Sequence, residues 1–334
     1  MFADITRTLA TCALLFLVPH SLAWAQADRI ERRAYKIGFL GQTSAPDMTA
    51  QTGALREGLR AAGYDEDRNL AIEYRWAERK LDRLPALAKE LVGLKVDLIV
   101  THGSAGARAA REATGKIPIV IAVIGDPVGN GVVASLARPG GNATGLVLQE
   151  FETAVKWLEL LKEILPTASR IGWLEVPDVE RAEAAAAAQR AEDAAARRLG
   201  FEVQRAVVRG AGDLPPAIEG LAREGVHAVV VPNSSLLNPL APQIATLTIS
   251  HRLPSVGSTL FARAGGLIAY GPDGPDMYRR AARYVDAIFK GAQPGELPME
   301  GPAKLEMTVN LKTARALGVR VPAALAARAD HRIE

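Results

Sequence analysis

Apolar residues follow two different spacings along the first third of the chain. Short apolar runs at residues 35–41 (YKIGFLG), 96–103 (VDLIVTHG) and 117–123 (IPIVIAV) are typical of buried strands, and residues 69–77 (NLAIEYRWA) alternate apolar and polar positions. Between these runs, apolar positions recur at helical spacing in residues 50–62, 81–93 and 104–115. Strands that alternate with helices of about 10 to 15 residues indicate a parallel, doubly wound sheet.

The same alternation begins again in the second half of the chain. Helices are predicted over residues 152–165, 180–199, 214–224 and 242–252, with strands over residues 170–176, 201–208, 226–233, 253–258 and 265–271. We therefore expect an α/β protein with two doubly wound parallel-sheet lobes. The tail adds a helix (277–290), an extended piece (295–302), a strand (304–310) and a second helix (311–318). Such extra units are expected when the chain returns to one lobe and then to the other, which makes a hinge and a cleft between them.

Length and charge narrow the class of protein. The chain has 334 residues and is 49% hydrophobic, which is enough for two cores. Its 40 basic and 37 acidic residues leave a net charge of +3, so a nucleic-acid partner is not expected.

Residues 1–25 have the features of a secretory signal peptide. Arg7 precedes an apolar run over residues 9–18, and Ala23-Trp24-Ala25 is a small-x-small cleavage site before Gln26. The alternative is an uncleaved membrane anchor, although the apolar run is short for a membrane span. The one cysteine, Cys12, lies in this segment, so the mature chain would have no disulfide, thiol nucleophile or Cys-ligated metal.

Signatures of an enzyme are weak or missing. Gly129-Asn130-Gly131 with Ala134 matches a G-x-G-x-x-A pattern, and Glu150 lies roughly where a ribose-binding acid would. However, Asp126-Pro127 separates these glycines from the strand, and only a short helical piece (129–137) follows. The sequence has no phosphate loop, no nucleophile elbow and no histidines at metal spacing. We therefore expect no catalysis, no cofactor and no bound metal.

Polar and aromatic residues instead gather at the predicted carboxyl ends of strands, where open α/β sheets bind ligands. The candidate ligand-binding residues are Gln42, Thr43, Ser44, Thr101, Gly103, Ser104, Asp126, Trp173, Asn233, Ser234 and Tyr270. Ser104 would be the N-cap of a helix whose free N–H groups suit an anion, or a plain cap. Asp126 would bind an amine or cap the turn after it. Trp173 and Tyr270 would stack on a ligand or fill the core.

Long blocks in a fixed order resemble a known family. They include LREGLRAAGYDEDRNLAIEYRWAE, IPIVIAVIGDPVGNGVVASLARPGGNATG, WLELLKEILP, AGGLIAYGPD and LPMEGPAKLEMTVNLKTARALGVRVP. From about residue 36 to the end, the chain resembles the extracytoplasmic substrate-binding proteins of ABC importers, in the branch of tryptophan and tyrosine binders. The resemblance implies a type I periplasmic-binding fold with crossings near Leu148, Pro272 and Pro302. The lobes would then comprise residues 35–148 plus 273–302, and residues 149–272 plus 303–334.

The resemblance also implies a function. A soluble periplasmic monomer would close on a small polar, amino-acid-like solute and deliver it to the membrane subunits of an ABC permease. WLEVP and PSVGSTLFARAGG depart from the family pattern on the cleft side of the second lobe, which leaves the identity of the solute open. A periplasmic sensor subunit that signals to a membrane receptor is the alternative, and a secreted enzyme on the same fold is a weaker one.

Overall fold

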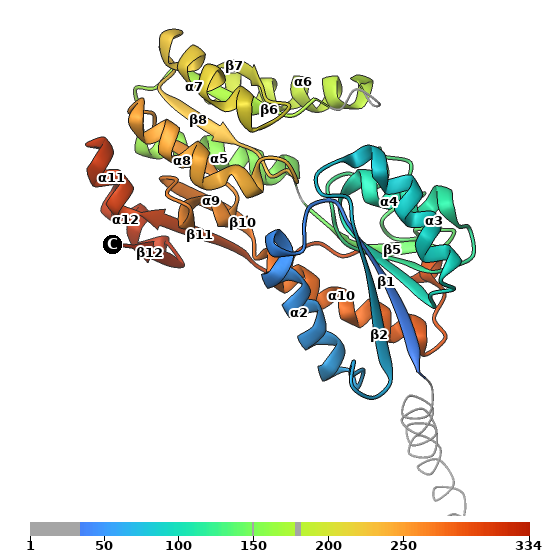
Figure 1. The fold of residues 1–334 in the computed structure, drawn as a ribbon. Helices are drawn as coiled ribbons and strands as arrows, with labels where there is room; N and C mark the ends of the chain where they lie inside the picture. The colour runs from blue at the N-terminus through green and yellow to red at the C-terminus, as the bar shows by residue number, and fades with distance from the viewer. Residues whose placement is uncertain (1–33, 149, 178–181) are drawn as a thin grey trace, which may run out of the picture.

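The computed structural model describes residues 34–148, 150–177 and 182–334. The predicted signal peptide and Cys12 lie outside these residues. Two sheets, each covered by helices, form two lobes that are joined side by side (Figure 1).

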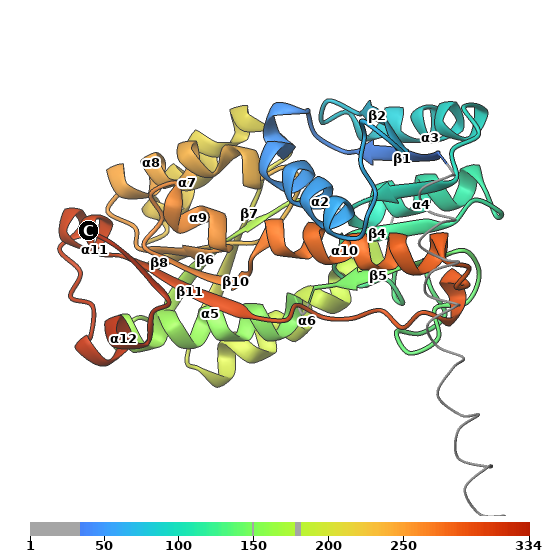
Figure 2. The ribbon, with the colours of Figure 1, turned by 90° about the horizontal axis from the view of Figure 1, so that it is seen from below.

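The first sheet has the strand order β2-β1-β3-β4-β5, and all its strands are parallel. Its strands are β1 (Tyr35–Gly41), β2 (Leu70–Trp76), β3 (Leu98–Thr101), β4 (Ile119–Ile124) and β5 (Ala143–Val147). Helices α3 (Leu84–Gly93) and α4 (Gly103–Ala113) cover one face. The other face is covered by α2 (Thr49–Ala61) and by α10 (Gly274–Phe289), which comes from far along the chain (Figure 2). Apolar side chains from both helix layers bury the sheet.

The second sheet has the strand order β12-β11-β10-β9-β8-β6-β7. Its strands are β6 (Arg170–Glu175), β7 (Glu202–Val207), β8 (Ala228–Val231), β9 (Ser255–Gly257), β10 (Ile268–Pro272), β11 (Leu305–Asn310) and β12 (His331–Ile333). One face packs on α5 (Glu150–Ile164), α6 (Ala182–Arg198), α11 (Leu311–Leu317) and α12 (Ala323–Arg328). The other face packs on α7 (Leu214–Arg223), α8 (Ala241–Ser250) and α9 (Thr259–Arg263).

The chain passes between the sheets three times. It leaves the first sheet after β5 and enters α5, it leaves the second sheet after β10 and enters α10, and it returns to the second sheet as β11. Because β10 leaves and β11 enters at the same edge, these two strands are antiparallel. The second sheet is therefore parallel except at this pair, a detail that the sequence pattern did not predict. The exact lobe boundaries predicted from the resemblance stay a prediction.

Other differences are local. The helical piece predicted at residues 129–137 is wrong, because these residues form turns and bends. Strand β5 was not predicted, since its five residues (ATGLV) are few and follow directly on a glycine-rich turn. Gly145 in this strand has φ +144°, and a Cβ there would lie 2.0 Å from the Ile121 carbonyl oxygen of β4. A side chain at position 145 would force the two strands apart.

Candidate functional site

A cleft of about 930 Å³ lies between the two lobes. Its walls come from both sheets at the carboxyl ends of their strands, which is where open α/β sheets bind ligands. The volume falls in the range of about 300 to 1,000 Å³ that is usual for small-molecule sites. The predicted residues that line it are Gln42, Thr43, Gly103, Ser104, Trp173, Asn233, Ser234 and Tyr270.

The wall of the first lobe is built around a reciprocal contact between two strand ends. The backbone N–H of Gln42 donates to Nε2 of His102 (3.2 Å), and the Gln42 side-chain amide donates to the His102 carbonyl oxygen (2.6 Å). Gly103 has φ +63°, and a Cβ there would lie 2.4 Å from Nε2 of Gln42, so the glycine lets the amide pack against the start of α4. Burial lowers the pKa of His102 to about 4. The ring is therefore neutral at physiological pH and can accept the hydrogen bond.

Thr43 contributes to this wall a buried hydroxyl without a hydrogen-bond partner in the described part of the chain. Its side chain is only 4% exposed, and Oγ1 has no hydrogen-bond partner among the described residues. A buried hydroxyl without a partner is costly, so such groups in native proteins call for an explanation. Thr43 lines the cleft, but Oγ1 itself is enclosed in this arrangement, so a ligand becomes its partner only if this wall adjusts on binding.

Four predicted residues have other roles in this structure. The N-cap position of α4 is occupied by His102, so the prediction that Ser104 caps this helix is wrong; its hydroxyl instead accepts from the Asn130 amide (2.7 Å). Thr101 is fully buried beneath the cleft, and its hydroxyl donates to the Leu40 carbonyl oxygen (2.9 Å).

Local turns hold the other two. The Ser44 hydroxyl donates to Asp47 (2.7 Å), and the Asp126 carboxylate accepts from the Gly129 N–H (2.7 Å). Of the two roles foreseen for Asp126, the structure therefore bears out the turn cap. Thr101, Ser44 and Asp126 are not among the described residues that line the cleft.

The aromatic residues Trp157, Trp173 and Tyr270 contribute to the wall of the second lobe. Trp157 of α5 donates its indole N–H to the Tyr270 carbonyl oxygen (2.7 Å), which joins α5 to β10 behind the cleft surface. Trp173 is 3% exposed and belongs to the core, with the Arg205 guanidinium 5.4 Å from the centre of its ring. Trp173 therefore offers the cleft very little surface, while Tyr270 is half-buried and open to it.

Two of the predicted polar residues, Asn233 and Ser234, also lie on this wall. The side-chain oxygen Oδ1 of Asn233 accepts from the Asn238 side-chain amide (2.7 Å), and the Ser234 hydroxyl accepts from the Leu237 N–H (2.9 Å). Both side chains are thereby held in place at the end of β8, with the Asn233 amide nitrogen and the Ser234 hydroxyl proton still able to donate.

Glu150 is a cleft residue that the strand-end rule missed, because it lies at the start of α5 rather than at a strand end. Glu150 is exposed, and its carboxylate opens to the cleft. Partial desolvation at the cleft wall, together with the neighbouring Glu192 and Asp126, raises the pKa of Glu150 to about 7. In the sequence, Glu150 was considered only as the ribose-binding acid of the dinucleotide-binding pattern.

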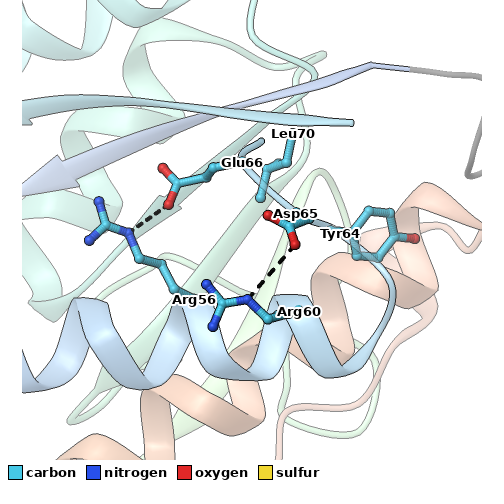
Figure 3. Close-up of a pocket in the computed structure, with 6 residues that line it drawn as sticks. All are labelled: Arg56, Arg60, Tyr64, Asp65, Glu66 and Leu70. Atoms are coloured by element: carbon cyan, nitrogen blue, oxygen red, sulfur yellow. Dashed lines mark ion pairs between the residues drawn. The ribbon is translucent and has the colours of Figure 1, made fainter. Parts of the chain in front are cut away.

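A second cavity, between α2 and the loop before β2, carries no ligand-site argument (Figure 3). Its volume is about 10 Å³, enough for roughly one water molecule. Its charged side chains neutralise one another: Arg56 pairs with Glu66 (2.9 Å) and Arg60 with Asp65 (3.9 Å).

Within the described residues there is no cluster of three or more side chains that could hold a metal ion. None of the helices in that part of the chain is both long enough and apolar enough to span a membrane.

Comparisons with known proteins agree with this architecture. A curated tyrosine-binding protein of Clostridioides difficile (strain R20291) is 24% identical over 290 residues, which cover 86% of this chain and 82% of the relative. Among solved structures, a conserved domain protein from Vibrio cholerae O1 biovar eltor is 27% identical, with a TM-score of 0.83 over 90% of this chain and 100% of that chain. An ABC domain from Streptococcus pneumoniae in complex with L-Trp is 25% identical, with a TM-score of 0.82 and the same coverage.

The expected two-lobed α/β fold is confirmed by these structural matches. A family model described as ABC transporter substrate binding protein matches residues 36–333, which is nearly all of the described chain. The chain therefore belongs to the family of ABC transporter substrate-binding proteins.

Proposed function

We propose that this protein is the extracytoplasmic receptor of an ABC importer, which closes its two lobes on an amino-acid-like solute and presents it to a membrane permease. The observation that carries the proposal is the cleft, because both lobes line it at the carboxyl ends of their strands. A solute held there contacts both lobes and so stabilises their closed arrangement. Binding and closure are the whole function, and no bond is broken.

The chemistry of the walls supports an amphipathic solute. On the first lobe, the unpartnered Thr43 hydroxyl and the N–H groups at the start of α4 suit the carboxylate of an amino acid. On the second lobe, the half-buried Tyr270 offers aromatic surface for an apolar or flat body, and Asn233 offers an amide. The relatives named above bind tyrosine and L-Trp, so aromatic amino acids are the first solutes to test.

A thermal-shift screen of the purified protein tests the class of solute. The screen compares the twenty amino acids with nucleosides, sugars and small organic acids. A ligand at a hundredfold excess over its Kd adds about 2.7 kcal/mol to the free energy of unfolding, which is easily seen as a rise in Tm. We expect the hits to fall among the amino acids. Hits confined to sugars or nucleosides, or a screen without any hit, would contradict the proposal.

A pair of threonine variants then tests the cleft itself. Thr43→Val removes a hydroxyl that has no protein partner, so we expect a loss of solute affinity of about 5- to 10-fold with no loss of stability. Thr101→Val is the matched control, because its hydroxyl bonds to Leu40 below the cleft. It should lower the free energy of unfolding by about 1 kcal/mol and leave the affinity nearly unchanged. Equal effects of the two variants on affinity would show that Thr43 does not touch the solute.

A further inference from the structure

A single carboxylate occupies the junction of the two lobes at the floor of the cleft. Glu150 is the first residue of α5, directly after the chain has left the first sheet. Its carboxylate lies over Gly125, the residue that follows β4 of the first lobe: a Cβ on Gly125 would be only 2.3 Å from Oε2 of Glu150. Glu150 thus belongs to a helix of the second lobe while its charge sits at the strand edge of the first. A ligand group bound to this carboxylate touches both lobes at once.

Most of the charged side chains that line the cleft are negative. The acids that line the cleft are Asp47, Asp82, Glu112, Glu150 and Glu192, and Arg108 is the one basic side chain among the described lining residues.

Two of these acids already have cations beside them in the protein. Asp47 pairs with Arg79 (2.7 Å), and Glu192 pairs with Arg205 (3.0 Å). For Glu150, by contrast, the described residues provide neither a hydrogen bond nor an ion pair. A carboxylate beside other negative charges is unfavourable, and a bound cation removes that repulsion.

From this arrangement we propose that Glu150 receives the ammonium group of the solute, so that the cleft selects protonated amines over otherwise identical molecules. This inference rests on the proposed function and specifies its substrate class. It also replaces Asp126, whose carboxylate is already engaged by the Gly129 N–H and does not line the cleft. Gly125 has a specific part in the arrangement, since the missing side chain leaves the space that the carboxylate fills.

A purely structural role is the competing explanation, because an acid in the first turn of a helix is favourable for the helix dipole alone. The chain offers a matched control for it. Glu152 lies in the same turn of α5, is exposed and does not line the cleft. Glu152→Gln therefore removes a charge from the same helix end without touching the site.

Isothermal titration calorimetry with two pairs of probes tests the inference. The probes are L-tyrosine and L-tryptophan, each with its amine-free analogue, 3-(4-hydroxyphenyl)propionate and 3-(indol-3-yl)propionate. For the wild-type protein we expect the amine to improve affinity by about 10- to 100-fold, as a charge-assisted hydrogen bond does. Glu150→Gln should abolish this preference, whereas Glu152→Gln should retain it.

Gly125→Ala tests the same point without removing the charge. Its methyl group would occupy the place of the Glu150 carboxylate and displace it, so the preference for the amine should fall although the charge of the protein is unchanged. This second variant keeps the test valid if Glu150→Gln fails to fold.

The pH dependence of binding gives a readout that a structural role would not move. Between pH 8 and pH 6 the Glu150 carboxylate takes up a proton, while the ammonium and carboxylate of the probe stay ionised, so wild-type affinity for L-tyrosine should fall toward pH 6. The charged groups facing Glu150 are Asp126 and Glu192, the latter paired with Arg205. His102 on the opposite wall stays neutral over this range. In Glu150→Gln the fall in affinity should disappear.

The outcomes separate the inference from the function on which it rests. If wild-type protein binds neither amino acid nor their analogues, the proposed aromatic amino-acid receptor fails, and the inference fails with it. If wild-type protein binds an amino acid and its amine-free analogue equally, and Glu150→Gln and Gly125→Ala bind as wild type does, the role of Glu150 is overturned while the receptor function stands.

Discussion

Substitution of Gly58 by alanine tests how the returning chain is fastened to the first lobe. Gly58 lies in α2, where α10 crosses it closely (Figure 2). A Cβ at position 58 would lie 2.4 Å from the carbonyl oxygen of Arg279 and 2.8 Å from Cβ of Ala282, both in α10. The two helices would have to separate by about 1 Å to restore ordinary contacts of roughly 3.5 to 4.0 Å.

The magnitude follows from two opposing effects. Overpacking of a well-packed core costs about 1 to 3 kcal/mol, and a clash with a backbone carbonyl cannot be relieved by rotation of a side chain, so we take the upper end. Alanine in place of glycine in a helix returns about 1 kcal/mol. The net loss for Gly58→Ala is therefore about 2 kcal/mol of the free energy of unfolding, or a fall in Tm of about 3 °C for a folded chain of this length.

Gly53 provides the control in the same helix. It has no atom within 4 Å of the place of its Cβ, so Gly53→Ala should only gain helix propensity and raise the free energy of unfolding by about 0.5 to 1 kcal/mol. Urea denaturation and calorimetry of both variants give the comparison. The two substitutions should act in opposite directions. A Gly58→Ala protein as stable as Gly53→Ala would refute the close packing of α10 on α2.

Three further predictions concern the cleft. The pKa of His102 falls from 6.5 to about 4 on folding, so the unfolded chain binds the proton more tightly than the folded chain. The free energy of unfolding should therefore drop by about 3 kcal/mol between pH 7 and pH 4. Urea denaturation at the two pH values measures this drop, which should be smaller in His102→Gln. The pKa of Glu150 rises from 4.5 to about 7, so wild-type stability should fall as the pH rises through that range, and Glu150→Gln should remove this loss and raise the Tm at pH 8. Trp157→Phe leaves the Tyr270 carbonyl oxygen without its indole donor, which should cost about 1 to 2 kcal/mol in urea denaturation. An unchanged unfolding midpoint in that variant would show that the hydrogen bond adds nothing.

Much of the secondary structure was predictable because the periodicity of apolar residues is a local property. The buried strands YKIGFLG and IPIVIAV were predicted as β1 and β4, and the amphipathic segment at residues 214–224 corresponds to α7. Strand β5 was missed because its five residues have too little pattern of their own and its place is decided by pairing with β4. The antiparallel direction of β11 was also beyond a local reading, because it depends on where the chain re-enters the second lobe.

The residues of the candidate site were also predictable only in part. The alternation of strands and helices is enough to say that residues after the strands, such as Thr43 and Asn233, lie at the ligand-binding edge, and both do line the cleft.

The sequence by itself thus determined the two α/β lobes, the sheet edge at which the cleft lies and the family, since these depend on periodic patterns and long ordered blocks. Only the tertiary structure decided which side chains face the cleft. Asp126 is turned aside by the N–H of Gly129, three residues away, whereas Glu150 is carried to the strand edge of the other lobe by the crossing of the chain. The physical reason is that a hydrogen bond within a turn engages the Asp126 carboxylate, while the space above Gly125 is filled by the Glu150 carboxylate. Neither contact can be predicted from the local spacing of apolar residues.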